Sequence, residues 1–407
     1  MNFTKNRRKI HVGEFIATEQ IKKNVIEVLD SGRISENIKV NQFEKKWAEF
    51  VGTKYSIALN SGTSALIAGL EAIKQKYPNI KNTKIITTPL TYIATINAIA
   101  LTGFTPVFID VEISKFGISP EKIKLFLENN DNPNDFSIIL PVHLMGYAVD
   151  MDEINKISKE YGFLVMEDCA QAHGTIYKKR RVGTYSLLSA YSFYIAHNIQ
   201  AGQLGAVATN DKDIINLIRQ IKSNGRWCTC DVCLRAQGKC PYSEADFEPR
   251  FTHNLIGYNF KIMEFEAAIA LAQIEDVNSI IERRQENVKI LNEYLDEFSD
   301  ILKLPLYSKD VSYLGYPLVL IDEKISIIEL KQKLEKEGVE TRPLFGYIPH
   351  QPAYSYLNDD YEGKLPNAEY LGKKGFYIGC HQYLEKDDLE YIYKVFKEVI
   401  NSLKTTN

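Results

Sequence analysis

The chain has 407 residues, of which 45% are hydrophobic, and its 49 Lys and Arg nearly balance its 52 Asp and Glu. This length accommodates two domains with a large core, and the composition is typical of a soluble globular protein. The net charge of −3 gives no electrostatic reason to expect nucleic acid or an anionic membrane as a partner. No apolar run approaches the ~20 residues that span a bilayer. The basic start, Met1–Arg8, is not followed by the apolar core of a signal peptide, so we expect a cytoplasmic protein.

Short apolar runs alternate with helical patterns over the first ~270 residues, which predicts an α/β fold with a mostly parallel sheet covered by helices. Most runs lack polar alternation, as expected for strands that are buried on both faces. Ser64–Gln75 and Met151–Tyr161 have the spacing of helices between these strands. The expected strands are Tyr55–Leu59, Lys84–Thr88, Pro106–Asp110, Ser137–Pro141, Phe163–Glu167, Leu188–Phe193 and Ala206–Thr209.

The last third of the chain has a different pattern. Glu264–Arg284 has few helix breakers and carries apolar residues at helical spacing, so we expect one long helix that links a large domain to a small one. An apolar strand (Leu318–Ile321) and two helices (Ile325–Gly338 and Lys386–Leu403) follow it. We therefore predict a large domain over residues 1–275, with a loop at 226–242, and a smaller α+β domain over 276–407.

Asn60–Ala65 follows an expected strand and opens an expected helix. In this position Ser61, Gly62 and Thr63 would present free backbone N–H groups and the positive end of the helix to a phosphate. Ser and Thr are also ordinary N-cap residues, so the stretch alone fits a plain helix start equally well.

Glu167 and Asp168 lie at the end of another buried strand, where α/β sheets bind their ligands. A carboxylate held against a pyridine nitrogen keeps that nitrogen protonated, so that the ring accepts electrons. Asp168 also fits a helix cap, and the nearby His173 also fits a packed core histidine. Tyr92 follows a further strand and is placed to stack on a planar ring, although most of the 24 tyrosines simply pack.

Ser192–Gly205 leaves an apolar strand and enters a turn that contains His197. An imidazole moves protons near neutral pH, because its unperturbed pKa is about 6.5. It does not form a stable Schiff base. His197 is therefore a candidate for proton transfer and not for covalent attachment of an aldehyde.

In this order, these stretches resemble the DegT/DnrJ/StrS family of sugar aminotransferases and dehydratases that use pyridoxal phosphate. The resemblance runs from Val12 to Tyr354 and is most specific at Asn60–Thr63, Glu167–Gly174, Ser192–Gly205 and Gly257–Lys261. It implies fold type I of the pyridoxal-phosphate-dependent transferases, as in aspartate aminotransferase. It also implies a homodimer whose active sites are shared between the subunits.

The resemblance implies a role for each residue of the site. The hydroxyl and glycine residues would hold the cofactor phosphate, which Asn259 would reach from the partner subunit. Asp168 would pair with the pyridine nitrogen, Tyr92 would stack on the ring, and Gln171 would lie close to it. The implied cofactor-binding set is Ser61, Gly62, Thr63, Tyr92, Asp168, Gln171, Ser192 and Asn259.

His197 stands where the family has its Schiff-base lysine, five residues after Ser192, and residues 182–210 contain no lysine. The same exchange is typical of the family's 3-dehydratases of nucleotide-linked 4-keto-6-deoxyhexoses, which hold pyridoxamine phosphate without a covalent bond. There the histidine is the base that removes a cofactor proton while the sugar loses its C3 hydroxyl. The resemblance therefore implies His197 and Asp168 as catalytic residues. A degenerate, inactive site is the alternative.

Four of the six cysteines, Cys228, Cys230, Cys233 and Cys240, crowd into one short segment. In a cytosolic protein such crowding indicates a metal site. Four thiolates ligate either a [2Fe–2S] cluster or Zn²⁺, and the spacing alone leaves both open. The run is similar to that of the iron–sulfur branch of the 3-dehydratases. This similarity implies a [2Fe–2S] cluster and a reductase with flavin and iron–sulfur centres as the electron donor.

The leading hypothesis is a dehydratase that uses pyridoxamine phosphate and a [2Fe–2S] cluster to remove the C3 hydroxyl of a nucleotide-linked 4-keto-6-deoxyhexose. The alternatives are the same chemistry with a structural zinc loop, a non-catalytic relative that binds a nucleotide sugar, and an aminotransferase. Gln203-Leu204 departs from the Glu-Gly of many family members. Arg342, His350 and Tyr354 are candidates for substrate contacts.

Overall fold

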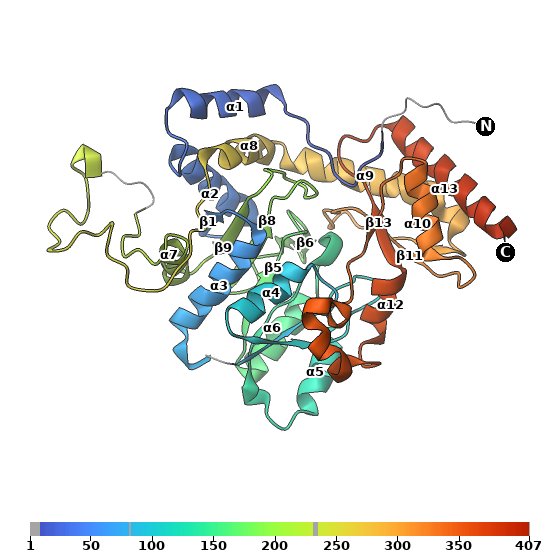
Figure 1. Ribbon diagram of the computed structural model, residues 1–407, viewed down its shortest axis with the longest axis horizontal. Coiled ribbons are helices and arrows are strands. Elements are labelled where there is room, and N and C mark those ends of the chain that lie inside the picture. The colour runs from blue at the N-terminus through green and yellow to red at the C-terminus, as the bar shows by residue number, and fades with distance from the viewer. Residues whose placement is uncertain (1–8, 81–82, 231–234, 407) are drawn as a thin grey trace.

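The computed structural model describes residues 9–80, 83–230 and 235–406, and its centre is a seven-stranded sheet in the order β1-β9-β8-β5-β4-β2-β3 (Figure 1). Every strand expected in this part of the chain is present within one residue or two of its predicted bounds. The strands are β1 (Tyr55–Leu59), β2 (Lys84–Thr87), β3 (Thr105–Phe108), β4 (Phe136–Ile139), β5 (Leu164–Asp168), β8 (Leu188–Ser192) and β9 (Gly205–Thr209). The expected α/β class is confirmed.

The sheet is mostly parallel, as expected, but β9 runs antiparallel to both of its neighbours, β1 and β8. Antiparallel neighbours are joined by a loop, whereas parallel neighbours need a crossover. Residues 193–204 therefore form a loop at the carboxyl end of β8. This loop carries His197 to the same edge of the sheet at which β5 ends with Asp168.

Helices cover both faces of this sheet (Figure 1). One face packs on α3 (Gly62–Lys76), α4 (Ile93–Leu101) and α7 (Lys212–Ile221). The other packs on α2 (Ile38–Val51), α5 (Pro120–Glu128), α6 (Met151–Tyr161) and α8 (Glu264–Glu275), with α1 (Glu19–Asp30) outside α8. Successive residues of β9 enter different cores: Val207 packs on the first face, Ala206 and Ala208 on the second. Alternation of this kind explains why the strands are apolar throughout.

The long helix expected over Glu264–Arg284 is broken, which corrects the prediction. α8 ends at Glu275 and α9 (Val277–Leu295) begins after Asp276, whose backbone (φ −103°, ψ 7°) leaves the helical region. Apolar residues keep a helical spacing on both sides of the break, so the spacing gives no sign of it.

A second, four-stranded antiparallel sheet lies in the C-terminal part, in the order β10-β11-β13-β12. Its strands are β10 (Leu302–Lys303), β11 (Tyr316–Leu320), β12 (Arg342–Pro343) and β13 (Gly375–Ile378). The remaining elements are α10 (Ile327–Lys336), α11 (Asn358–Tyr361), α12 (Pro366–Lys374), α13 (Lys386–Thr406) and the hairpin of β6 (Ile176–Tyr177) and β7 (Arg180–Arg181). No helix in the described ranges has the length and hydrophobicity of a membrane span.

Candidate functional site

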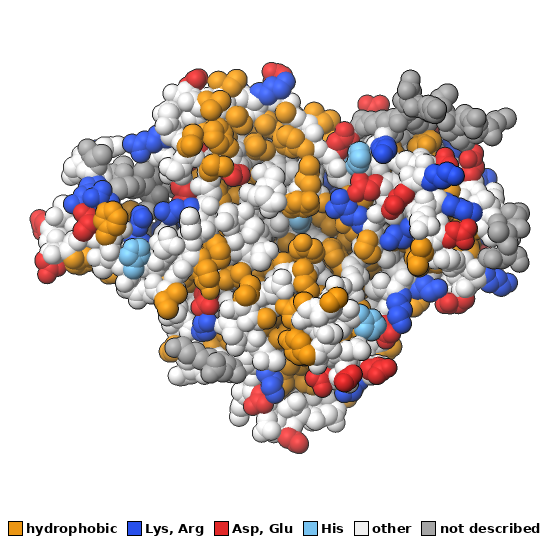
Figure 2. Space-filling model, in the orientation of Figure 1, with side chains coloured by type: hydrophobic (Ala, Val, Ile, Leu, Met, Phe, Trp, Pro, Cys, Tyr) orange, Lys and Arg blue, Asp and Glu red, His pale blue; other side chains and the backbone are white. Residues whose placement is uncertain are grey.

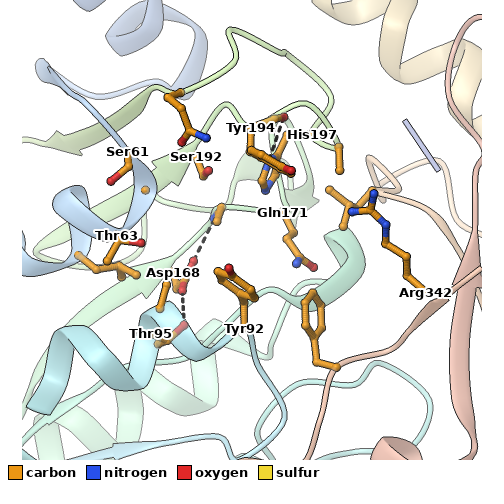
Figure 3. A pocket seen from close by; sticks show the side chains of 18 of the residues that line it. Ser61, Thr63, Tyr92, Thr95, Asp168, Gln171, Ser192, Tyr194, His197 and Arg342 are labelled. Carbon is orange, nitrogen blue, oxygen red and sulfur yellow. Dashed lines mark hydrogen bonds between the residues drawn. The ribbon is translucent and has the colours of Figure 1, made fainter. Parts of the chain in front are cut away.

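A cavity of about 390 Å³ lies at the carboxyl ends of β5 and β8 (Figure 3). It brings together residues that are far apart in the sequence. The predicted site residues in its wall are Ser61, Gly62, Thr63, Tyr92, Asp168, Gln171, Ser192 and His197. Asn259 is the one predicted cofactor residue that does not line it. The roles assigned to these residues stay predictions, but their convergence on one cavity is a finding.

The N-terminus of α3 forms one end of this cavity. Ser61 caps the helix by accepting a 3.1 Å hydrogen bond from the backbone of Ser64, so the plain-cap interpretation is right for its side chain. The helix start also packs tightly on the sheet: a Cβ at Gly62 would lie 2.6 Å from Cβ of Ser192, and one at Gly205 would lie 2.0 Å from the carbonyl oxygen of Ser61. Both glycines are therefore required by close approach. The arrangement suits an anion held by helix N–H groups and hydroxyls.

Asp168, the last residue of β5, is buried at the floor of the cavity. Its Oδ2 accepts a 2.8 Å hydrogen bond from the hydroxyl of Thr95, and its Oδ1 accepts a 3.0 Å bond from the backbone of Ala170 (Figure 3). A turn follows it, so the helix-cap interpretation of Asp168 is wrong. Burial raises its pKa, and it has no cationic partner among the described residues. A ligand that presents an N–H⁺ group to Asp168 would supply the missing partner.

A buried network behind Asp168 fixes the end of β5. Nε2 of His143 lies 3.0 Å from Oε2 of Glu167, and Nδ1 of His143 accepts a 3.2 Å bond from the backbone of Val149. His143 therefore donates its proton to Glu167. With Cys169 these two residues form a group of potential metal ligands, but both imidazole nitrogens are already engaged. The network is structural.

His197 lies in the β8–β9 loop with 8% of its surface exposed. Its Nδ1 is 3.2 Å from the carbonyl oxygen of Tyr194 (Figure 3). Because a carbonyl oxygen only accepts, Nδ1 carries the proton and the lone pair of Nε2 is free. Burial lowers the pKa of His197 to about 4; the carbonyl of Tyr194 opposes this shift and the charge of Arg284 adds to it. His197 is therefore a neutral base at ordinary pH.

His173 packs behind His197, with the two rings near parallel (21°) and their centres 5.9 Å apart. His173 is completely buried against Trp47 and Phe193, at ring-centre distances of 5.1 and 4.8 Å. Burial holds its pKa well below the usual range. The packed-core interpretation of His173 is right. The ring of His197 packs against the ring of His173.

None of the described residues that line the cavity is a lysine. The two lysines nearest in sequence before the His197 loop, Lys178 and Lys179, lie in the β6–β7 turn, where Lys178 pairs with Asp152. Neither of these lysines lines the cavity.

Several residues that line the cavity were not predicted from the sequence. Arg342, which was a candidate, lines the cavity and pairs with Glu340 at 3.0 Å. His350 and Tyr354 do not line it; the Tyr354 hydroxyl donates to Asn97 instead. The unpredicted lining residues are Leu66, Ala94, Thr95, Ala170, Tyr194, Ala196, Leu314, Phe345 and Tyr377. Of these only Thr95 carried a signal, because it lies one helical turn after Tyr92 and so on the same face.

Of the two residues Gln203 and Leu204, which differ from the Glu-Gly of many family members, only Gln203 is part of the cavity. Gln203 lines the cavity, whereas Leu204 is buried in the core shared with α2 and α8. The neutral amide of Gln203 therefore lines the cavity, and Leu204 packs in the core.

The cysteine segment lies outside this cavity. Cys228, Cys230 and Cys240 are half-buried and form no disulfide, and Cys233 lies outside the described residues. In the described part of the chain, the group of possible metal ligands within 4.8 Å of one another is the His143 group, without these cysteines. The metal site stays a prediction. Asn259 is exposed and pairs with Ser223 near the same segment.

Comparisons with known proteins give the following matches. The model of the DegT/DnrJ/EryC1/StrS aminotransferase family matches residues 16–397. The lipopolysaccharide biosynthesis protein RfbH of Salmonella typhimurium is 30% identical over 370 residues, which cover 88% of this chain and 84% of the relative. GDP-perosamine synthase of Escherichia coli O157:H7 is 31% identical over 383 residues, covering 94% and 96%. The structure of GDP-4-keto-6-deoxymannose-3-dehydratase (ColD), a mutant with bound GDP-perosamine, matches with a TM-score of 0.82 at 25% identity, covering 95% and 100%.

Proposed function

Because the chain belongs to the DegT/DnrJ/EryC1/StrS aminotransferase family and has the fold type I expected from its sequence, we propose that it binds pyridoxamine phosphate and removes the C3 hydroxyl of a nucleotide-linked 4-keto-6-deoxyhexose. Proteins similar to this chain include one named as an aminotransferase and others named as 3-dehydratases. The observation that favours dehydration is His197, a buried neutral base in a cavity whose described lining residues include no lysine.

The cavity has the groups that this cofactor needs. The first turn of α3, with Thr63 and Ser192, suits its phosphate, and the unpaired carboxylate of Asp168 suits its pyridine N–H⁺. Tyr92 and Gln171 line the same cavity, near Asp168 (Figure 3). When bound, pyridoxamine phosphate supplies an amine that condenses with the sugar ketone and a ring that accepts electrons.

His197 would then act through Nε2, which is free to take a proton from the cofactor C4′ carbon. General base catalysis of this kind contributes roughly 10²–10⁴ in rate. A histidine that has accepted a proton in this buried position binds it weakly, since burial disfavours the charged form. It is therefore a good donor to a departing hydroxyl. A lysine here would instead hold the cofactor covalently and favour aminotransfer.

We include in the proposal a [2Fe–2S] cluster on Cys228, Cys230, Cys233 and Cys240, supplied with electrons by a reductase that carries flavin and iron–sulfur centres. Loss of the hydroxyl leaves a product that needs two electrons, and such a cluster delivers them one at a time. The support is the four-cysteine pattern. A structural zinc loop is the competing interpretation of that pattern.

We also propose a homodimer, on two observations. Asn259 is exposed and stands outside the cavity of its own chain. Figure 2 shows hydrophobic side chains over the surface where α1 lies, and α1 carries the large exposed side chains Ile26 and Leu29. An exposed apolar patch of this kind marks a protein interface.

The test begins with anaerobic purification, iron and zinc analysis, and visible and paramagnetic resonance spectra. The protein is then supplied with pyridoxamine phosphate, a chemical reductant and GDP-4-keto-6-deoxymannose or its CDP-glucose-derived counterpart. We expect iron, and a 3-deoxy sugar product by mass spectrometry. His197→Asn is expected to stop solvent exchange of the cofactor C4′ proton. A colourless zinc protein would remove the electron relay, and an amino sugar formed with glutamate would establish the aminotransferase instead.

A further inference from the structure

A completely buried arginine, Arg284, lies on α9 beside the site. Its Nη1 donates to the carbonyl oxygens of Tyr313 (3.1 Å) and Leu314 (2.9 Å), and its Nε donates to the side chain of Gln382 (3.1 Å). Among the described residues, its Nη2 has no nitrogen or oxygen partner, the thiol of Cys380 interacts with the guanidinium, and no carboxylate pairs with it. Burying a charge without a counter-ion is unfavourable, so this arginine is not explained by stability.

One backbone segment connects Arg284 to the proposed base. Residues 312–314 accept hydrogen bonds from Arg284 on one side and from Asn198 on the other, where Nδ2 of Asn198 is 2.7 Å from the carbonyl oxygen of Ser312. Asn198 directly follows His197, and Leu314 lines the cavity with His197. The guanidinium of Arg284 therefore holds the segment 312–314, which contributes to the cavity wall and is hydrogen-bonded to the residue after His197.

The charge of Arg284 also acts on both imidazoles. Burial is the main reason why the pKa values of His197 and His173 are low, and the positive charge of Arg284 lowers them further. The other groups near His197 are the ring of His173 packed behind it, the ring of Tyr194 and, lining the same cavity, Asp168, Arg342 and Tyr377. Asp168 is the sole carboxylate among the described lining residues, and Thr95 and Ala170 already engage it.

We propose that Arg284 is a positioning residue of this site, whose hydrogen bonds fix the Tyr313–Leu314 wall and whose buried charge adds to the preference of His197 for the neutral form. The inference rests on the proposed role of His197. A neutral His197 is ready to accept a proton, and once protonated beside Arg284 it gives the proton up readily. Arg284 therefore keeps the accepting nitrogen of His197 unprotonated before the reaction and favours release of the proton afterwards, without touching the substrate.

The experiment measures the protonation of His197 in the protein without cofactor. The Cε1–H resonance of labelled histidine is followed against pH and assigned with His197→Asn. Arg284→Gln keeps an amide donor but removes the charge, Arg284→Lys keeps the charge with fewer hydrogen bonds, and Arg283→Gln removes a charge from the adjacent, partly exposed position.

We expect wild type, Arg283→Gln and Arg284→Lys to titrate at the same low pH. In Arg284→Gln, His197 is expected to titrate at a higher pH than in wild type, because a charge that opposes its protonation is gone. A folded Arg284→Gln that titrates like wild type would overturn the proposal. If Arg284→Gln does not fold, Arg284→Lys decides: a raised His197 pKa in that variant overturns the role of the charge, and an unchanged one supports it. Absence of dehydration would contradict the proposed function but leave this titration unaffected.

Discussion

The hydroxyl of Thr95 donates a 2.8 Å hydrogen bond to Oδ2 of Asp168 and so ties the first turn of α4 to the end of β5. This bond lowers the pKa of a carboxyl group that burial otherwise raises. Asp168 is thereby kept closer to the ionised form that a pyridinium nitrogen requires.

Thr95→Val should weaken cofactor binding, because it removes a hydrogen bond to a charged group with little change in shape. Such bonds are worth about 1.5–3 kcal/mol, so we expect the Kd for pyridoxamine phosphate to rise roughly tenfold or more. Fluorescence titration measures it. The matched control is Thr91→Val, since Thr91 contacts the hydroxyl of Thr95 and not Asp168. Equal Kd values for the two variants would contradict the role of Thr95.

The buried His197 should make the stability of the protein depend on pH. Its pKa is lowered from 6.5 to about 4, so between these values the unfolded chain binds more protons than the folded one. The stabilisation is complete above pH 6.5 and is lost as the pH falls toward 4. From pH 7 to pH 5 the free energy of unfolding should fall by about 2 kcal/mol more in wild type than in His197→Asn. Urea unfolding at both pH values checks this, and parallel losses would argue against a neutral, buried His197.

Close packing at the N-terminus of α3 predicts different outcomes for Gly205, the first residue of β9, and Gly202, in the loop before it. A Cβ at Gly205 would lie 2.0 Å from backbone, whereas Gly202 has open space but a positive φ of 77°. Gly205→Ala should lower the free energy of unfolding by about 1–3 kcal/mol through overpacking and should also weaken phosphate binding. Gly202→Ala should lower it by only about 1 kcal/mol and leave phosphate binding intact. Unfolding curves and cofactor titration together distinguish the two variants. Similar cofactor affinities in both would contradict the phosphate site proposed at the first turn of α3.

The strands of the central sheet could be predicted from the sequence because their burial determines which residues they contain. A strand that is covered on both faces must be apolar at every position, so the runs from Tyr55–Leu59 to Ala206–Thr209 identify the sheet. The place of Asp168 follows from the same reasoning, since it ends such a run. The antiparallel direction of β9 and the break at Asp276 depend on tertiary packing and leave no periodic signal.

Some of the residues that escaped prediction reach the site over long sequence distances. Tyr377 comes from β13 of the second sheet and Leu314 from the segment just before β11, and nothing in their own neighbourhood marks them as lining a cavity that begins at Ser61. His173 and His197 were both visible as histidines, but their stacking depends on how two loops meet beside Trp47. In the sequence, Arg284 is an ordinary charged residue of a helical pattern, and nothing local predicts that it is completely buried.

Restoring an amine at the position of His197 should change how the cofactor is held. In His197→Lys, burial and the charge of Arg284 would lower the pKa of the new lysine, which leaves part of it as a neutral, nucleophilic amine. We expect it to hold pyridoxal phosphate covalently, so that borohydride reduction adds the cofactor mass to the peptide that contains residue 197. Dehydration should be lost. Gln203→Lys is the matched control, because Gln203 lines the same cavity from another position. Labelling of both variants, or of neither, would show that position 197 has no special access to the cofactor aldehyde.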